Sequence, residues 1–128
     1  MPSTRIETRS GWLGARRGEF IEAVQAALVE GILIPAQDRC VRLHEFELDA
    51  VISPATSSER YTVIEISLFT GRSIEAKRRL YAAMVTRLAA FGLEPHDIKV
   101  ILHEVPRENW GLRGKPASEI ELGFKVDV

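Results

Sequence analysis

The segment from Tyr61 to Gly114 constrains the fold most, because its hydrophobic pattern changes period twice. Residues 61–69 alternate as in a strand, residues 74–91 place apolar side chains three and four positions apart, and residues 98–105 alternate again. Gly92 follows the helical stretch, where glycine commonly ends helices. A strand, a helix and a strand in this order predict one βαβ unit, with parallel strands and a right-handed crossover.

The residues before this unit resemble a weaker copy of it. Residues 2–9 alternate weakly, residues 15–32 carry one apolar helical face, and residues 39–48 again alternate as in a strand. Gly31 is placed to end the first helix in a left-handed conformation. Two such units predict an α/β fold in which a four-stranded sheet has two helices on one face.

The 128 residues are expected to form a single domain, 1–128. Its halves span about 2–48 and 61–114, and the serine-rich residues 49–60 are predicted to form a mobile linker between them. Residues 120–128 alternate with period two. They predict a C-terminal strand that covers the sheet of its own chain or of a neighbour.

Composition narrows the possible functions. The net charge of −1 gives no electrostatic case for binding nucleic acid. The single cysteine, Cys40, excludes a disulfide within the chain and a cysteine-based zinc site, and we expect it to be a small buried residue. The three histidines have no metal-ligand spacing. No apolar run approaches the roughly 20 residues of a membrane helix, so a soluble cytoplasmic protein is expected.

Three short motifs, in their order along the chain, resemble the tautomerase superfamily. Residues 66–73 (Ile-Ser-Leu-Phe-Thr-Gly-Arg-Ser), with Lys77, are similar to the strand-to-helix turn of 4-oxalocrotonate tautomerase. Residues 99–104 are similar to its second strand, and Trp110-Gly111 to an aromatic residue and glycine that line its site. The fused length and the Gly-Arg-Ser turn also resemble malonate semialdehyde decarboxylase. The resemblance covers nearly the whole chain and is strongest over residues 64–114.

The resemblance implies a cofactor-free enzyme, assembled as a homotrimer, that uses an N-terminal proline amine on a small carboxylate substrate. Pro2 becomes that amine once Met1 is removed, which we expect because proline is small. A terminal amine has a pKa of about 7.7–8.0. An apolar pocket or a nearby guanidinium lowers this pKa toward neutrality, where a general base works best.

The resemblance also implies roles for five further residues. Arg72 would bind the substrate carboxylate, Asp38 would orient water or substrate, and Arg42 would polarise the substrate carbonyl. Trp110 would form an apolar wall, and Thr70 stands at a substrate-contacting position where decarboxylating relatives carry an additional arginine. Without the resemblance, Arg72 would be interpreted as a surface arginine in a turn and Arg42 as an exposed strand residue. Asp38 is equally compatible with a turn residue before a strand, and Trp110 with a core or interface residue.

The favoured function is therefore keto-enol tautomerisation of a small 2-keto or enol carboxylic acid, with Pro2 carrying the proton. A first alternative is decarboxylation or hydration of a three-carbon acid such as malonate semialdehyde, led by Pro2 and Asp38. The single arginine of the 70–73 turn weakens that alternative. A second alternative is a non-enzymatic trimeric protein with the same fold.

Overall fold

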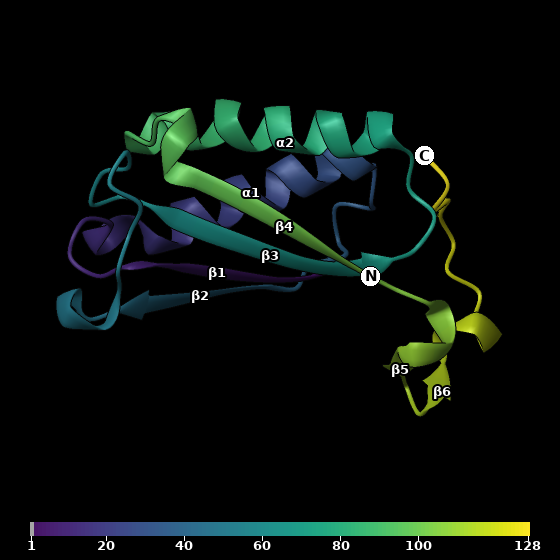
Figure 1. Cartoon of the computed structure of the whole chain (residues 1–128). Helices are drawn as coiled ribbons and strands as arrows, with labels where there is room; N and C mark the ends of the chain where they lie inside the picture. The colour runs from purple at the N-terminus through teal and green to yellow at the C-terminus, as the bar shows by residue number, and fades with distance from the viewer. Residues whose placement is uncertain (1) are drawn as a thin grey trace.

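Four strands form the central sheet of the computed structural model, which describes residues 2–128. They lie in the order β2-β1-β3-β4 (Figure 1). Their bounds are Ser3–Arg9 for β1, Val41–Phe46 for β2, Thr62–Phe69 for β3 and Ile98–Val105 for β4. β1 pairs in parallel with β2, and β3 with β4, whereas the central strands β1 and β3 are antiparallel. The two predicted βαβ units and their four-stranded sheet are confirmed.

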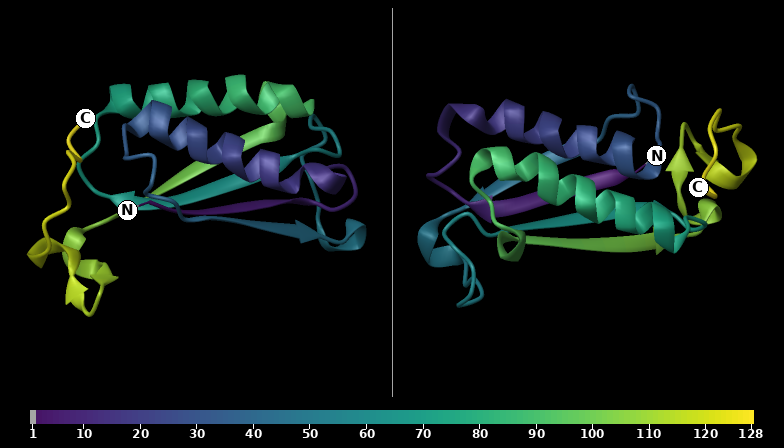
Figure 2. Two further views of the ribbon diagram at one scale, coloured as in Figure 1. Left: turned by 180° about the vertical axis from the view of Figure 1, so that it is seen from behind. Right: turned by 90° about the horizontal axis from the view of Figure 1, so that it is seen from above.

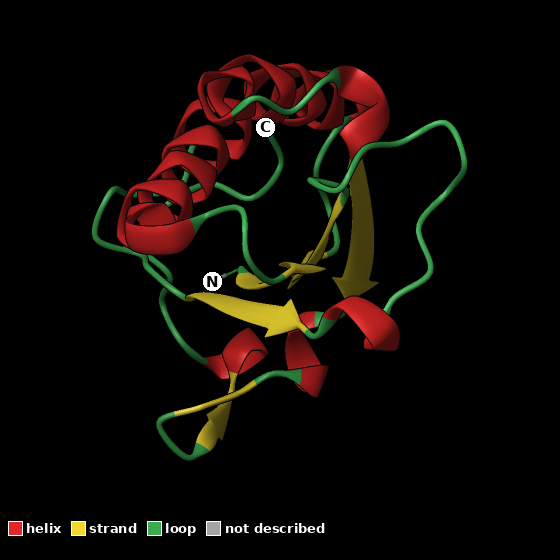
Figure 3. Ribbon diagram, turned by 90° about the vertical axis from the view of Figure 1, so that its left-hand side faces the viewer, coloured by secondary structure: helices red, strands yellow, loops and turns green. Residues whose placement is uncertain are grey.

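The two long helices, α1 (Arg17–Ile32) and α2 (Ile74–Leu88), cover the same face of this sheet (Figures 1 and 2). Viewed along the strands, they form one layer above the sheet (Figure 3). The main core fills the space between these layers with apolar side chains from both halves. Its largest fully buried members include Phe20, Leu28, Ile64, Leu80 and Met84. Burial of this apolar surface is the main force that holds the halves together.

The two helices end differently, although the sequence predicted a glycine terminus for both. Ser73 caps α2 as predicted, since its hydroxyl oxygen accepts a hydrogen bond from the Ala76 amide at 3.1 Å. Gly92 has φ +80 and ends the short 3-10 turn after α2. In α1, however, Gly31 lies inside the helix and Leu33 takes the left-handed conformation, with φ 58. The prediction for Gly31 was wrong, and its real constraint is the neighbouring helix.

At Gly31, α1 passes close to the backbone of α2. A Cβ placed on it would lie 2.4 Å from the Leu80 Cα and 2.8 Å from the Leu80 amide nitrogen. These are backbone atoms of α2, so the contact cannot be relieved by a side-chain rotation. Glycine is therefore required by helix packing at this position.

The linker is attached to the second half through the buried carboxylate of Asp97. This carboxylate accepts hydrogen bonds from the Ser58 amide (2.7 Å), the Ser58 hydroxyl (2.9 Å) and the Glu94 amide (3.0 Å). Burial by itself would raise the pKa of Asp97, but these hydrogen bonds outweigh it and hold the pKa below its ordinary value. The linker residue Ser58 is thus fixed against the turn that precedes β4.

Replacing Asp97 with alanine is expected to lower the free energy of unfolding by about 2–4 kcal/mol at pH 7, because it leaves buried donors without partners. Since the pKa of Asp97 is depressed by folding, its contribution is present above the ordinary value of 3.8 and is lost as the pH falls through the folded value. Urea unfolding of wild type and Asp97→Ala at neutral and acidic pH measures this difference. A gap that does not narrow in acid would contradict the assignment.

The C-terminal segment differs from its prediction. Residues 120–128 form no strand in the described chain, and Gly123, with φ +76, interrupts the extended run. Val126 instead packs with Phe69 and Ala117 in a small second core. A short hairpin that the sequence did not predict, β5 (Gly111–Leu112) with β6 (Lys115–Pro116), precedes this segment. The predicted C-terminal strand was therefore wrong for the single chain.

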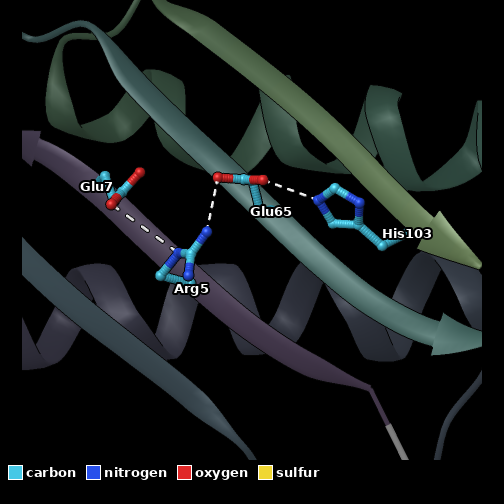
Figure 4. A network of polar contacts seen from close by, with 4 residues as sticks. All are labelled: Arg5, Glu7, Glu65 and His103. Atoms are coloured by element: carbon cyan, nitrogen blue, oxygen red, sulfur yellow. Dashed lines mark hydrogen bonds and ion pairs between the residues drawn. The ribbon is translucent and has the colours of Figure 1, made fainter. Parts of the chain in front are cut away.

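The sheet face opposite the helices is open and carries a chain of charges (Figure 4). The Glu65 carboxylate contacts His103 Nε2 at 2.8 Å and an Arg5 guanidinium nitrogen at 3.0 Å, and Arg5 Nε lies 3.9 Å from Glu7. The His103 hydrogen bond and the Arg5 guanidinium hold the pKa of Glu65 below its ordinary value. Ion pairs between exposed side chains contribute little to stability, so these contacts order this face more than they stabilise the fold.

Candidate functional site

The sheet topology brings the N-terminus to the end of the molecule where β3 and β4 finish (Figure 1). Because β1 is antiparallel to β3, Ser3 pairs with Ser67, near the last residue of β3. On the other side, the Thr4 amide donates to the Cys40 carbonyl at 2.9 Å. Pro2, which is buried, therefore stands at the same sheet end as the loop before β2 and the turn after β3. Met1 lies outside the described residues.

Arg72 is the most unusual side chain at this end, since it is a cation that is only 5% exposed. Its Nη1 donates to the Phe69 carbonyl at 3.3 Å. Its Nε and Nη2 are buried and make no hydrogen bond to any residue among 2–128. Burying polar nitrogens without partners is unfavourable, and a carboxylate can satisfy two guanidinium nitrogens at once. The arrangement can therefore bind a carboxylate.

The charges around Arg72 come from both halves of the chain. Burial lowers the pKa of Arg72, the nearby Asp38 carboxylate raises it, the Arg107 guanidinium lowers it, and Glu104 raises it. Arginine remains charged in proteins regardless. Asp38 and Arg72, which lie 34 positions apart, are thus brought close enough for their charges to interact.

Asp38 is held in place through its backbone. Its amide donates to the Pro35 carbonyl at 3.0 Å, and its own carbonyl accepts a hydrogen bond from Gln25 Nε2 at 3.0 Å. Gln25 is buried on α1. Its place among the apolar positions of the helix was the only sequence signal for this contact, and our sequence reasoning missed it.

Thr70 and Trp110 lie on the second-half side of this region. Thr70 is exposed, and its amide donates to the Val105 carbonyl at 3.3 Å. The Trp110 indole N–H donates to that same carbonyl at 3.2 Å, and its ring packs edge-on against Phe69 with centroids 5.1 Å apart. Phe69 thus contacts both residues: its ring packs against Trp110, and its carbonyl accepts the hydrogen bond from Arg72.

Arg42 is not gathered with Arg72 in the described chain. It is exposed, and its Nη1 lies 3.0 Å from Ser3 Oγ and 3.2 Å from Cys40 Sγ. Cys40 is also exposed, so the expectation that it is buried was wrong. The reason is its position just before the edge strand β2, where no neighbouring strand covers it.

A hollow of about 490 Å³ opens beside Asp38. One side is formed by the loop before β2 and the other by the β5 hairpin and the C-terminal segment. Its lining residues are Pro35, Gln37, Asp38, Gly111, Leu112, Arg113, Ile120, Glu121, Leu122 and Phe124. Mostly apolar walls with a few charged groups are typical of small-molecule sites. Residues 2–128 contain no cluster of three or more potential metal ligands among His, Cys, Asp and Glu.

A protein-family model described as tautomerase enzyme matches residues 38–113, more than half of the chain. A probable tautomerase of Ralstonia nicotianae is 35% identical over 57 residues, which are 44% of this chain and 81% of the relative. The 2-hydroxymuconate tautomerase of Comamonas testosteroni is also 35% identical over 57 residues, covering 44% of this chain and 90% of the relative.

Solved structures agree over nearly the full length. The FG41 malonate semialdehyde decarboxylase is 29% identical, with a TM-score of 0.80 over 91% of this chain and 92% of that protein. A native fused 4-OT, 24% identical, superposes with a TM-score of 0.83 over 95% and 99% of the two chains and supports the fold. Given the matched family model and the curated relatives, this chain belongs to the tautomerase family of enzymes.

Proposed function

We propose that this enzyme interconverts keto and enol forms of a small 2-keto carboxylic acid, with the amine of Pro2 carrying the proton. The single observation that supports this most strongly is Arg72, a buried guanidinium with two nitrogens free of hydrogen bonds to residues 2–128. It lies at the sheet end from which β1, and with it Pro2, begins. A carboxylate bound there would leave the rest of the substrate near the N-terminal amine.

The proposed reaction uses one base, the amine of Pro2, and neighbouring groups that stabilise charge and exclude water. Burial of Pro2 and the positive charge of Arg72 both disfavour a protonated amine, so they favour a neutral base at physiological pH. A proton removed from carbon leaves an enolate whose negative charge must be stabilised. Arg42 or a backbone amide would supply this stabilisation, and Trp110 would help to exclude water. The Arg42 side chain contacts Ser3, the residue that follows Pro2 in the chain.

Arg72→Ala is expected to lower kcat/KM for ketonisation of 2-hydroxymuconate or phenylenolpyruvate by about 10- to 100-fold, because a charge-assisted hydrogen bond contributes roughly 1.5–3 kcal/mol. Arg72→Lys should recover little of this loss, since lysine cannot bind a carboxylate through a planar fork. Arg78→Ala, on an exposed arginine of α2, the helix that follows Arg72 in the chain, serves as the control. Equal rates for wild type and Arg72→Ala, measured by absorbance, would exclude this carboxylate-binding role.

We further propose that the enzyme acts as a homotrimer on a small carboxylate in the cytoplasm. Fused 4-OT proteins with TM-scores of 0.79 and 0.77 to this chain were solved as asymmetric and symmetric trimers. No helix among residues 2–128 is long and apolar enough to cross a membrane. Light scattering at several protein concentrations tests the assembly, and a monomeric mass at all of them would contradict it.

Decarboxylation or hydration of malonate semialdehyde is the second candidate. The interaction between the charges of Asp38 and Arg72 favours it, because an acid and a cation together can hold both water and a carboxylate. The 29% identity to a malonate semialdehyde decarboxylase also supports it. Turnover of malonate semialdehyde that requires both Pro2 and Asp38 would favour this reaction over tautomerisation.

A further inference from the structure

Gln25 is a buried polar residue of α1 to which the proposed function gives no role. It is 4% exposed and lies among core residues of the helix such as Val24 and Leu28. Its Nε2 donates to the Asp38 carbonyl at 3.0 Å, whereas its Oε1 is buried and accepts no hydrogen bond from any residue among 2–128. A buried amide oxygen without a donor is unfavourable, so an apolar side chain would serve the core at least as well.

The loop that Gln25 contacts, residues 33–40, connects α1 to β2 at the end of the sheet where the N-terminus lies (Figure 1). None of residues 35–39 is buried. They line two different hollows, of about 490 and 480 Å³: Pro35, Gln37 and Asp38 line the first, and Ala36 and Arg39 the second. Because the loop borders open space at both hollows, its position depends on hydrogen bonds more than on packing.

The Gln25 hydrogen bond is a buried anchor that ties Asp38 to the helix layer. The Asp38 amide donates to the Pro35 carbonyl, which belongs to the same loop and moves with it. Arg39 forms an ion pair with Glu22 of α1, but both side chains are more than half exposed, and such pairs contribute little. Removing the Gln25 amide should therefore let the loop, and the Asp38 carboxylate with it, move relative to the rest of the site.

The position of the Asp38 carboxylate matters because its charge acts on Arg72. An acid that orients water or a substrate must lie within hydrogen-bonding distance of it, and a displacement of about 1 Å can lower a rate by about 100-fold. The proposed proton transfer at Pro2 makes no such demand on Asp38. A residue that fixes Asp38 should thus affect a reaction that uses this acid and leave enol ketonisation unchanged.

We infer that Gln25 is a positioning residue, whose side-chain amide fixes the backbone of Asp38 and so holds its carboxylate beside Arg72. This inference rests on the second candidate function, in which Asp38 takes part in turnover of malonate semialdehyde. In its decarboxylation the bond to the carboxylate carbon breaks and CO₂ leaves. The electron pair stays on the neighbouring carbon as an enolate, which takes up a proton to give acetaldehyde. The fixation of Asp38 can be measured without any turnover.

Gln25→Met keeps the length of the side chain and removes its donor. Exchange of the Asp38 amide with deuterated water, followed by NMR, should become about three- to tenfold faster, the factor expected for the loss of one neutral hydrogen bond. The midpoint of urea unfolding should stay near the wild-type value, because the buried amide oxygen is lost as well. Leu28→Met, at a buried position of the same helix, is the control and should leave the Asp38 exchange rate unchanged.

Kinetics distinguishes a positioning role from a merely structural one. Gln25→Met should lower kcat for decarboxylation of malonate semialdehyde by about three- to tenfold and leave ketonisation of phenylenolpyruvate unchanged. In an Asp38→Asn background, Gln25→Met should have no further effect, since its effect passes through Asp38.

Equal losses in both reactions, additive losses in the double variant, or an unchanged exchange rate at Asp38 would each overturn the inference. Faster exchange at Asp38 in Gln25→Met, combined with a wild type that does not decarboxylate malonate semialdehyde, would refute the candidate function and leave the fixation of Asp38 by Gln25 in place.

Discussion

Pro2→Ala should lower the rate of enol ketonisation by at least about 100-fold, since general acid-base catalysis contributes about 10²- to 10⁴-fold. The variant keeps a terminal amine, but it loses the secondary amine and the ring that occupy a buried position at the start of β1. The measurement is kcat/KM for 2-hydroxymuconate and phenylenolpyruvate by absorbance, with the N-terminus of each protein established by intact mass.

The direction in which the ketonisation rate changes with pH follows from the protonation state of the Pro2 amine. The amine must be neutral to accept a proton, so the rate should fall as the pH drops below the pKa of Pro2. That pKa should lie below the ordinary 7.7–8.0 of a terminal amine, because burial of Pro2 disfavours the protonated form. Glu59→Gln, in the exposed linker, is the control and should leave the pH profile unchanged. A wild-type rate that does not respond to pH in this range would contradict the assignment.

Gly31→Ala should lower the stability of the fold substantially, because the added methyl group would meet backbone atoms of α2. The new Cβ would meet the Leu80 backbone at 2.4 Å, so α1 and α2 would have to separate. Overpacking of this kind typically costs about 1–3 kcal/mol and sometimes more, and the better helix propensity of alanine returns less than about 1 kcal/mol. The free energy of unfolding, from urea denaturation, should fall by about 2 kcal/mol or more.

Gly18→Ala supplies the matched control for this prediction. Gly18 lies in the same helix, and a Cβ on it would meet nothing within 4 Å. This variant should therefore keep the stability of wild type or gain up to about 1 kcal/mol from helix propensity. If both alanine variants proved equally stable, the helices would not be in contact at Gly31.

The sequence predicted the fold because its strongest signals are local. Alternation and helical spacing identified the strands and helices, and Ser73 and Gly92 had the end-of-helix roles that were predicted for them. Gly31 and Gly92 are both glycines, but glycine is needed at the two positions for different reasons. Its constraint comes from Leu80, 49 positions away, and no local pattern records such a contact.

The candidate site, too, could be predicted only in part from the sequence. Resemblance to relatives supplied Pro2, Arg72 and Asp38 as candidates, and sheet topology brings all three to one end of the molecule. Arg107 and Gln25 could not be predicted, because one lies in a loop and the other on a helix face that was assigned to the core. The period of residues 120–128 indicated a strand, but Gly123 turns the chain so that Val126 packs against Phe69 instead.

Comparing intact mass with activity tests whether the amine of Pro2 carries the proton. Two otherwise identical proteins are compared, one beginning at Pro2 and one that retains a residue before it. Ketonisation of 2-hydroxymuconate should be confined to the protein whose mass shows a free Pro2. Equal rates for the two proteins, with the mass confirming that the amine of Pro2 is blocked in one of them, would contradict it.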